Sequence, residues 1–251
     1  VTVEDNIVPT AVCQNDTIYL DATGSATLDP AGLDGGSFDN CALNIIPSQT
    51  DFTCDDIGTQ NISVQFADAA GNADTCMAEV TVIDTLPPAA VCQNVTVFLD
   101  GSGTATFDPG LADGGSVDNC ELQFAVTPSN LACTNIGTQP YLLTVTDPSG
   151  NTDTCSAEVT VVDTVAPTAV CQNATVYLGA DGSGVLTAAD INANSSDNCG
   201  FTLNVDVDTF TCADLGVPQN VLLTISDVSG NTDTCSAQIT VADTLAPMMV
   251  C

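Results

Sequence analysis

Carboxylates are the side chains in this sequence that are most able to do chemistry, and no basic side chain opposes them. The 251 residues include 32 Asp and Glu but no Lys, Arg or His, which gives a formal charge of −32. The missing imidazole, amine and guanidinium groups are the common bases and nucleophiles of enzymes, and only a carboxylate-pair hydrolase remains as a catalytic option. We therefore expect no enzyme. The carboxylates are left to repel one another or to bind water and cations.

The same charge limits the partners of the chain. Binding to nucleic acid requires Lys or Arg at the phosphates, so we expect no nucleic-acid partner. We also expect no membrane insertion, because no apolar run is long enough to span a bilayer. All but four of the acidic residues are Asp, whose short side chain suits turns and sites for hard cations.

The 13 cysteines are the second chemical feature. A zinc site made of Cys alone needs closely spaced pairs such as C-x-x-C, and the sequence has none. Cysteine at this density without His therefore predicts disulfides and an oxidising compartment. We expect the protein to be extracellular or on the cell surface.

Three copies of one unit organise the chain. The segment Val-Cys-Gln-Asn recurs around Cys13, Cys92 and Cys171, 79 residues apart, and Val-Cys returns at Cys251. A fixed period of this length indicates an array of repeats. The expected division is residues 1–8 as the end of a preceding repeat and its linker, 9–87, 88–166 and 167–246 as three repeats, and 247–251 as the start of a following repeat.

Each unit is predicted to be all-β. In the second unit Val95, Val97 and Leu99 alternate with Thr96 and Phe98, the period of a strand with one buried face. An Asp-x-x-Gly-Asn segment between two such runs predicts a hairpin turn. Several short strands in about 79 residues favour a small immunoglobulin-like β-sandwich. The fold class is therefore a tandem array of such domains.

Three motifs recur in every unit and carry a resemblance. They are Asp-Asn-Cys, Asp-x-x-Gly-Asn-x-x-Thr-Cys, and Val-Thr-Val-x-Asp-Thr-x-x-Pro or a close variant of it. Together they resemble hyalin repeats and related immunoglobulin-like modules, which occur in tandem in long surface adhesins and secreted fibrous proteins of bacteria, notably Bacteroidetes. The resemblance implies a structural extracellular protein, a stiff rod or filament. The alternative is the stalk or a ligand-binding segment of a surface adhesin.

Four cysteines per unit allow three disulfide pairings. In a sandwich of this order the first and last strands start at the same end, which favours a bond between the first and fourth Cys. The second and third lie 13 residues apart, as in a local clasp. The predicted bridges are Cys13–Cys76, Cys92–Cys155, Cys171–Cys235, Cys41–Cys54, Cys120–Cys133 and Cys199–Cys212. Cys251 is left unpaired; a competing interpretation has it cross-link neighbouring chains.

The acidic motifs predict calcium sites. If strands alternate in direction, the Asp-Asn-Cys loop, the Asp-x-x-Gly-Asn hairpin and the linker Asp from the preceding repeat meet at one end of a unit. Ca²⁺ takes six to eight oxygen ligands and tolerates irregular geometry. The predicted sets are Asp5, Asp39, Asn40, Asp68, Asn72 and Asp74; Asp84, Asp118, Asn119, Asp147, Asn151 and Asp153; and Asp163, Asp197, Asn198, Asp227, Asn231 and Asp233.

The alternative to calcium is that these residues stabilise turns through their own backbone hydrogen bonds. Asp34 and Asp113 are further candidate ligands, ranked lower because the third unit has Asn192 there. A cation that joins linker and loop would fix the angle between neighbouring repeats, and carboxylate repulsion would loosen it when the cation is removed.

Two weaker features lie on the first strand of each unit. Tyr19, Phe98 and Tyr177 fall at one position per repeat and point outward by alternation. They predict lateral contact and self-association into fibres, or else a neighbouring loop covers them. Asn15, Asn94 and Asn173 begin Asn-x-Thr sequons. Thr85 and Thr164 lie in Asp-Thr-aliphatic triplets that resemble the O-glycan acceptor of Bacteroidetes, so glycosylation is predicted at both kinds of site.

Overall fold

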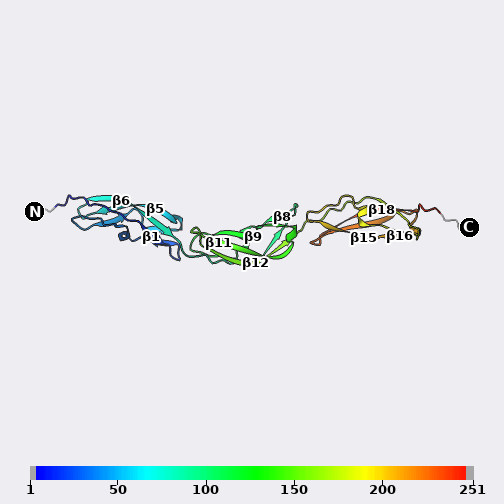
Figure 1. The fold of residues 1–251 in the computed structure, drawn as a ribbon, viewed down its shortest axis with the longest axis horizontal. Coiled ribbons are helices and arrows are strands. Elements are labelled where there is room, and N and C mark those ends of the chain that lie inside the picture. Colours follow the sequence, from blue (N-terminus) through cyan, green and yellow to red (C-terminus); the bar gives the residue numbers. More distant parts are fainter. Residues whose placement is uncertain (1–3, 247–251) are drawn as a thin grey trace. The chain divides into compact units, whose positions relative to one another are not determined.

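The computed structural model describes residues 4–246. These residues form strands joined by turns and by helices of three or four residues (Figure 1), so the fold is all-β, as predicted. The chain divides into two compact units, of which the first contains the chain up to Gln93 together with Asp108–Thr127 and Tyr141–Ala157. The division runs through the middle repeat. Each unit therefore holds one outer repeat and the part of the middle repeat that adjoins it.

Six strands and two short helices make up the first repeat. In chain order they are β1 (Asp16–Tyr19), β2 (Ser25–Thr27), η1 (Pro30–Leu33), β3 (Asn44–Pro47), β4 (Asp51–Thr53), η2 (Cys54–Asp56), β5 (Gly58–Ala67) and β6 (Ala73–Ile83). A sheet with the order β1-β6-β5-β3 lies beside the two-stranded sheet β2-β4. Between β5 and β6 the predicted hairpin forms, in which the backbone N–H of Asp68 donates to the carbonyl oxygen of Asn72 at 3.0 Å.

The middle repeat has the same succession of elements. They are β7 (Val95–Phe98), β8 (Thr104–Thr106), α1 (Pro109–Ala112), β9 (Gln123–Thr127), β10 (Asn130–Ala132), η3 (Cys133–Asn135), β11 (Gly137–Thr146) and β12 (Thr152–Val162). Within the first unit β9 pairs antiparallel with β11, and within the second β7 pairs parallel with β12.

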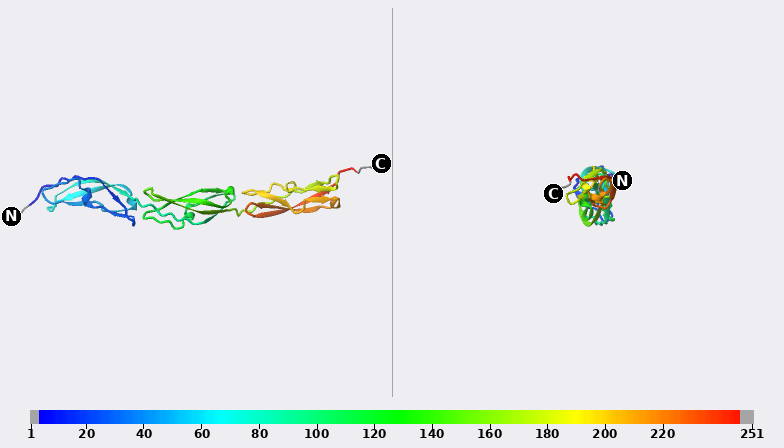
Figure 2. Two further views of the ribbon diagram at one scale, coloured as in Figure 1. Left: turned by 60° about the horizontal axis from the view of Figure 1, so that its bottom comes forward. Right: turned by 90° about the vertical axis from the view of Figure 1, so that its right-hand side faces the viewer.

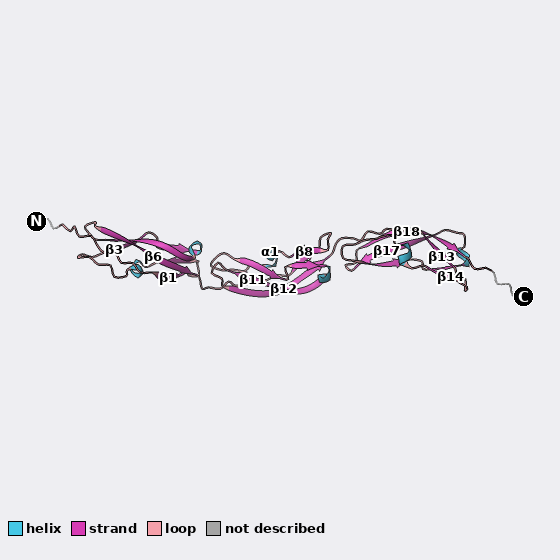
Figure 3. Ribbon diagram, turned by 45° about the horizontal axis from the view of Figure 1, so that its top comes forward, coloured by secondary structure: helices cyan, strands magenta, loops and turns pink. Residues whose placement is uncertain are grey.

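The third repeat repeats this order once more. Its elements are β13 (Ala174–Tyr177), β14 (Ser183–Val185), α2 (Ala188–Ile191), β15 (Phe201–Val205), β16 (Thr209–Thr211), η4 (Cys212–Asp214), β17 (Gln219–Asp227) and β18 (Thr232–Ala242). The two long strands of each repeat are prominent from several sides (Figures 2 and 3). The expected repeat limits, however, stay a prediction, because the compact units follow a different division.

Each core is built from alternating positions of the long strands. In the first repeat Ile62, Val64 and Phe66 of β5 are fully or almost fully buried, and their neighbours along the strand are exposed. Burial of such side chains stabilises by about 1.5–3 kcal/mol each. Among the described residues no helix is long and apolar enough to cross a membrane.

The first-to-fourth disulfides follow from the sheet. β1 and β6 pair in parallel, with Asp16 beside Val80. Parallel neighbours begin at the same end of a sheet, so the cysteines that precede or open them are close. Cys13 bonds to Cys76, Cys92 to Cys155 and Cys171 to Cys235, which are the predicted pairs.

The predicted local clasps Cys41–Cys54, Cys120–Cys133 and Cys199–Cys212 are wrong. The structure joins Cys54 to Cys120 and Cys133 to Cys199, so each of these bridges connects successive repeats. The second and third Cys of one repeat face opposite junctions. Cys41 lies 3.1 Å from a carboxylate of the preceding linker, whereas Cys54 follows β4 and reaches the next repeat. Cys41 and Cys212 form no disulfide within the described part of the chain, and Cys251 lies outside it.

Candidate cation site at the repeat junctions

The linker Asp is the innermost residue of each junction. Asp84 follows β6 and Asp163 follows β12, and their side chains are only 2% and 1% exposed. One oxygen of each, Oδ1, accepts the backbone N–H two residues on, at 3.0 Å. The other, Oδ2, is buried and finds no hydrogen-bond donor among the described residues. A buried carboxylate oxygen without a donor is costly unless a cation or water compensates for it.

The Asp-Asn-Cys loop adds further oxygens without partners. Asp197 accepts the N–H of Cys199 on Oδ2 at 2.9 Å, which is the turn role that the alternative interpretation predicted. Its Oδ1, however, is buried and has no donor in the described part of the chain, and the same holds for Oδ1 of Asp39. The amide oxygens of Asn119 and Asn198 are orphaned in the same way within residues 4–246.

The hairpin fixes the linker from the other side. Asp147 and Asp227 are 3% and 8% exposed. Asn151 donates its backbone N–H and its side-chain Nδ2 to Asp147, at 2.8 and 2.7 Å, and the same Nδ2 donates to the linker carbonyl of Asp84 at 3.1 Å. Asn231 joins Asp227 and Asp163 in the same manner. The hairpin Asn therefore positions carboxylates and presents nitrogen, not oxygen, to them.

These elements converge as the sequence predicts. Carboxylate oxygens of Asp163, Asp197 and Asp227 all lie within 4.8 Å of one another. The same clustering brings together Asp84 and Asp118 with the sulfur of Cys120, and Asp5 and Asp39 with that of Cys41. Like charges this close repel strongly, by about 4 kcal/mol at 4 Å near a protein surface. Hard oxygen donors of this kind are the ligands that Ca²⁺ takes in proteins.

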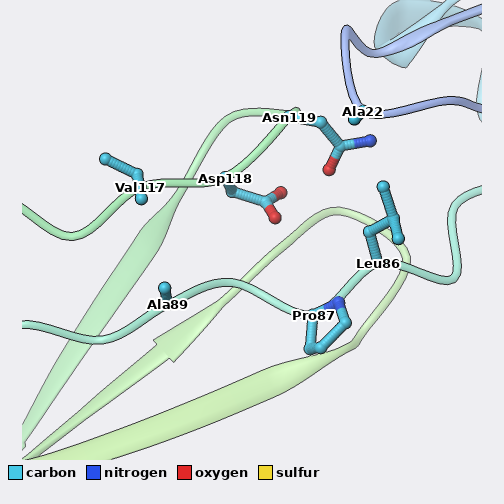
Figure 4. Close-up of a pocket in the computed structure, with 7 residues that line it drawn as sticks. All are labelled: Ala22, Leu86, Pro87, Ala89, Val117, Asp118 and Asn119. Carbon is cyan, nitrogen blue, oxygen red and sulfur yellow. The ribbon is translucent and has the colours of Figure 1, made fainter.

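At the first junction these oxygens border a pocket lined by Ala22, Leu86, Pro87, Ala89, Val117, Asp118 and Asn119. In the close-up the Asp118 carboxylate and the Asn119 amide oxygen point into the space beneath the loop, whereas the Asn119 nitrogen points toward the turn at Ala22 (Figure 4). That nitrogen donates to the carbonyl oxygen of Asp21 at 3.0 Å. One side chain thus holds the preceding repeat and offers an oxygen to the pocket.

The first cluster shows the effect of a missing neighbour. The thiol of Cys41 donates to Oδ2 of Asp5 at 3.1 Å, and this bond lowers the pKa of Asp5 and raises that of the thiol. Asn40 also donates to this oxygen, at 2.9 Å. The Asp5 carboxylate is therefore bonded by groups that, at the other two junctions, contact a preceding repeat.

Three predicted ligands have another role. Asp74, Asp153 and Asp233 each use both oxygens for backbone N–H groups. Asp153, for example, accepts from Ala90 at 2.9 Å and from Thr154 at 2.8 Å, and these bonds lower its pKa. These three acids therefore tie the incoming chain to the long strand and lie outside the clusters.

The lower-ranked candidates Asp34, Asp113 and Asn192 are turn residues. Each accepts the backbone N–H of the Ser three residues on, at 2.7 to 3.1 Å. Asn performs this role as well as Asp does, which explains why the third repeat dispenses with the charge.

Sequence reasoning missed the contacts that join the repeats. Besides the two bridges, Asn198 donates to the carbonyl oxygen of Asp100 at 3.0 Å, as Asn119 does to Asp21. A signal for the bridges exists in the sequence. The separation from the third Cys of one repeat to the second Cys of the next is 66 residues in both cases, a spacing as regular as the one that suggested local clasps.

The weaker predicted sites lie on the surface. Tyr19, Phe98 and Tyr177 are 59%, 59% and 63% exposed. The sequon residues Asn15, Asn94 and Asn173 are exposed, and each accepts the N–H of a residue on the long strand beside it through Oδ1. Thr85 and Thr164 are exposed as well. Lateral contact and glycosylation at these positions stay predictions.

The fold and its bridges define a class: tandem immunoglobulin-like β domains linked by disulfides within and between repeats. No family model matches the sequence. The chain is similar to Hyalin of Strongylocentrotus purpuratus, with 32% identity over 276 residues that cover 98% of this chain and 22% of Hyalin. The chain thus spans about a fifth of the length of that relative. Because this organism is not a bacterium, the comparison does not support the expected bacterial source.

Two solved structures with similar chains are also tandem arrays. Sidekick-1 immunoglobulin domains 1–5 give a TM-score of 0.39 at 11% identity, covering 94% of this chain and 59% of that chain. Mouse cadherin-23 EC22–24 gives a TM-score of 0.32 at 11% identity, covering 94% and 99%.

Proposed function

We propose that this chain is a segment of an extracellular structural array whose repeat junctions bind Ca²⁺. One observation carries the proposal. At both junctions a linker Asp with an orphaned, buried oxygen lies within 4.8 Å of a second carboxylate, in a chain without any basic residue. Neither an ion pair nor a described donor compensates for this charge, and a divalent cation would. The five disulfides are typical of proteins in oxidising compartments.

The donor set favours calcium over other biological cations. The oxygens come from carboxylates and an Asn amide that three separate elements supply, so they form an irregular cage. Mg²⁺ demands a near-ideal octahedron, whereas Ca²⁺ accepts this kind of geometry. Zn²⁺ prefers His or thiolate ligands; the chain has no His, and Cys120 and Cys199 are held in disulfides.

The proposed role of the ion is mechanical. It would join the linker Asp, the loop Asp and the hairpin Asp, which otherwise repel one another. The disulfide and the Asn hydrogen bond connect the same loop to the preceding repeat. Ion and disulfide together would restrict the angle between repeats, which gives a stiff rod or filament.

The test is thermal unfolding of the whole chain with Ca²⁺ and with excess chelator, together with small-angle scattering of the same samples. We expect chelation to lower the melting temperature and to increase bending of the particle. Saturation at about 100 times the dissociation constant would stabilise each site by about 2.7 kcal/mol. An unchanged melting temperature and scattering curve would refute calcium binding and leave the acidic clusters as turns and a charged coat.

A matched pair of variants localises the effect. Asp163→Asn removes one linker carboxylate with little change in shape, whereas Glu158→Gln removes an equal charge from the exposed middle of β12. We expect the first to reduce the Ca²⁺-dependent rise in melting temperature and the second to preserve it. Mg²⁺ in place of Ca²⁺ should give a much smaller rise.

A second function, adhesion, rests on the exposed aromatic residues. Tyr19, Phe98 and Tyr177 occupy one position in each repeat, next to the long strand of the four-stranded sheet. Exposed aromatic side chains at a regular spacing favour lateral contact with a second array or with a partner surface. Replacement of all three by Ser should abolish concentration-dependent bundling in sedimentation experiments without a loss of stability. Bundling that persists in this variant would exclude these residues from the contact.

A further inference from the structure

Two cysteines are left over from the inter-repeat series, and they are complementary. Within the chain, the third Cys of one repeat bonds to the second Cys of the next, as Cys54–Cys120 and Cys133–Cys199 show. Cys212 is a third Cys, Cys41 is a second Cys, and both are exposed without a disulfide in the described residues. We propose that Cys212 of one copy forms a disulfide with Cys41 of another, joining copies of this chain head to tail.

The surface around Cys212 already has the form that receives an Asp-Asn-Cys loop. At the first junction Gly24, with φ +72°, approaches the loop so closely that an added Cβ would lie 2.5 Å from the carbonyl oxygen of Asn119. Gly103, with φ +74°, receives Asn198 at 2.8 Å. Gly182 has the same φ of +74°, but a Cβ there would meet only the Cys212 sulfur, at 3.1 Å. The receiving surface is therefore present and free of the loop.

The acceptor for the loop Asn is also in place beside Cys212. At the internal junctions this Asn donates to the carbonyl oxygen of Asp21 or Asp100, each of which accepts the N–H of a Gly three residues on. Gly179 occupies the corresponding place in the third repeat and makes the same turn with Gly182, at 2.9 Å. A backbone carbonyl serves as acceptor whatever the side chain, so the change from Asp to Gly leaves the site intact.

The opposite half-site is the Asp-Asn-Cys loop around Cys41. Asn40 donates to the Asp5 carboxylate at 2.9 Å, as Asn198 does to Asp163 at 3.1 Å. Asn198 additionally holds the preceding repeat, a bond for which Asn40 has no counterpart in the described chain. Oδ1 of Asp39 is buried and lacks a donor among the same residues, as the equivalent oxygen of Asp197 does at a complete junction. The loop thus has the form it takes in a finished junction.

Two features set the conditions for this contact. Each copy carries 32 negative charges and no positive one, so copies repel one another unless salt or a divalent cation screens them. Asp243 and Asp5 are equivalent linker residues, since each accepts the N–H two residues on. At a junction between copies only one of them can take the place that Asp84 holds within the chain, and the other segment must leave.

The chemistry is an ordinary thiol oxidation. The thiol of Cys212 and the thiol of Cys41 lose two protons and two electrons and form one S–S bond. A small-molecule disulfide such as oxidised glutathione accepts them and yields two glutathione thiols, through a mixed disulfide at one of the two cysteines.

The experiment uses the full chain with Cys251→Ser in every sample, so that only Cys41 and Cys212 remain outside the five internal bridges. The protein is incubated with oxidised glutathione and CaCl₂ and is separated by electrophoresis without reductant. We expect a ladder of covalent oligomers that collapses to monomer on reduction. Peptide mapping should find Cys212 joined to Cys41.

Single variants distinguish this contact from random oxidation. Cys41→Ser and Cys212→Ser should each remain monomeric, and their mixture should give one heterodimer and no higher species. Equal yields of Cys41–Cys41 and Cys212–Cys212 dimers would overturn the proposal, as would a chain that stays monomeric or closes on itself. Because the test reads covalent connectivity, it can succeed with NaCl in place of CaCl₂ even if the proposed calcium sites do not exist.

Discussion

Cys120 is bonded to Cys54, a residue 66 positions earlier that belongs to the preceding repeat. The same relationship joins Cys199 to Cys133. The loop that carries the second Cys also carries an Asp of the acidic cluster and an Asn that donates to the preceding repeat. Three successive residues therefore combine a candidate cation ligand, a hydrogen bond and a covalent bond at each junction.

Removal of an inter-repeat bridge should destabilise a junction without unfolding the repeats. In the chain-entropy model a bridge that closes 66 residues contributes about 4 kcal/mol. We expect the double variant Cys133→Ser, Cys199→Ser to melt in separate steps by calorimetry, because its repeats are less strongly coupled. The double variant Cys171→Ser, Cys235→Ser is the control, since it opens a bridge of similar span within one repeat. That control should lower the melting temperature of one repeat only.

Glycine at the clasp should be essential where a neighbouring repeat docks. In Gly103→Ala the new Cβ would lie 2.5 Å from the sulfur of Cys133, at a φ of +74° that disfavours side chains. We expect a loss of about 2–4 kcal/mol from backbone strain and overpacking together. Gly182→Ala has the same backbone cost but meets only the Cys212 sulfur, at 3.1 Å, so it should lose less. Chemical unfolding of both oxidised proteins measures the difference, and equal losses would show that docking does not constrain Gly103.

Asn119→Asp should separate the two tasks of this side chain. The variant loses the N–H donor to the Asp21 carbonyl, which costs about 1 kcal/mol, and it adds a charge to the cluster. We expect a lower melting temperature in chelator and a larger rise on addition of Ca²⁺ than in the natural chain. Asn15→Asp, on the exposed first strand, makes the same chemical change away from the junction. If both variants respond to Ca²⁺ alike, the Asn119 oxygen does not face the cation.

Acid should weaken the attachment of the linkers. Backbone N–H groups of Ala90 and Ala169 hold the pKa of Asp153 and Asp233 below the usual 3.8. A carboxyl whose pKa is lower in the folded state stabilises above its unfolded pKa, and this stabilisation is lost as pH falls through the folded value. We expect the urea midpoint to be level near neutrality and to fall below about pH 4. In the double variant Asp153→Asn, Asp233→Asn this fall should be smaller, and an identical pH profile would argue against these two acids as its source.

The repeat period, the all-β fold and the composition of the acidic clusters could be predicted from the sequence because each depends on local patterns. Alternation of apolar residues determines which face of β5 or β7 is buried, and β1 lies parallel to β6. The direction of the strands then brings Asp163, Asp197 and Asp227 to one end of a repeat. Such reasoning identifies the elements that meet, and it also identified the first-to-fourth disulfides.

Only the tertiary structure decided what each member of a cluster does. Asp153 and Asp163 are both conserved in position from repeat to repeat of this chain, yet one spends its oxygens on backbone N–H groups and the other keeps a buried oxygen without a described donor. Sequence spacing also could not show that Cys41 and Cys54 face opposite ends of a repeat. A separation of 13 residues permits a local bridge, but disulfide geometry requires the two Cα atoms to lie within about 7 Å, and folding brings Cys54 that close to Cys120 instead.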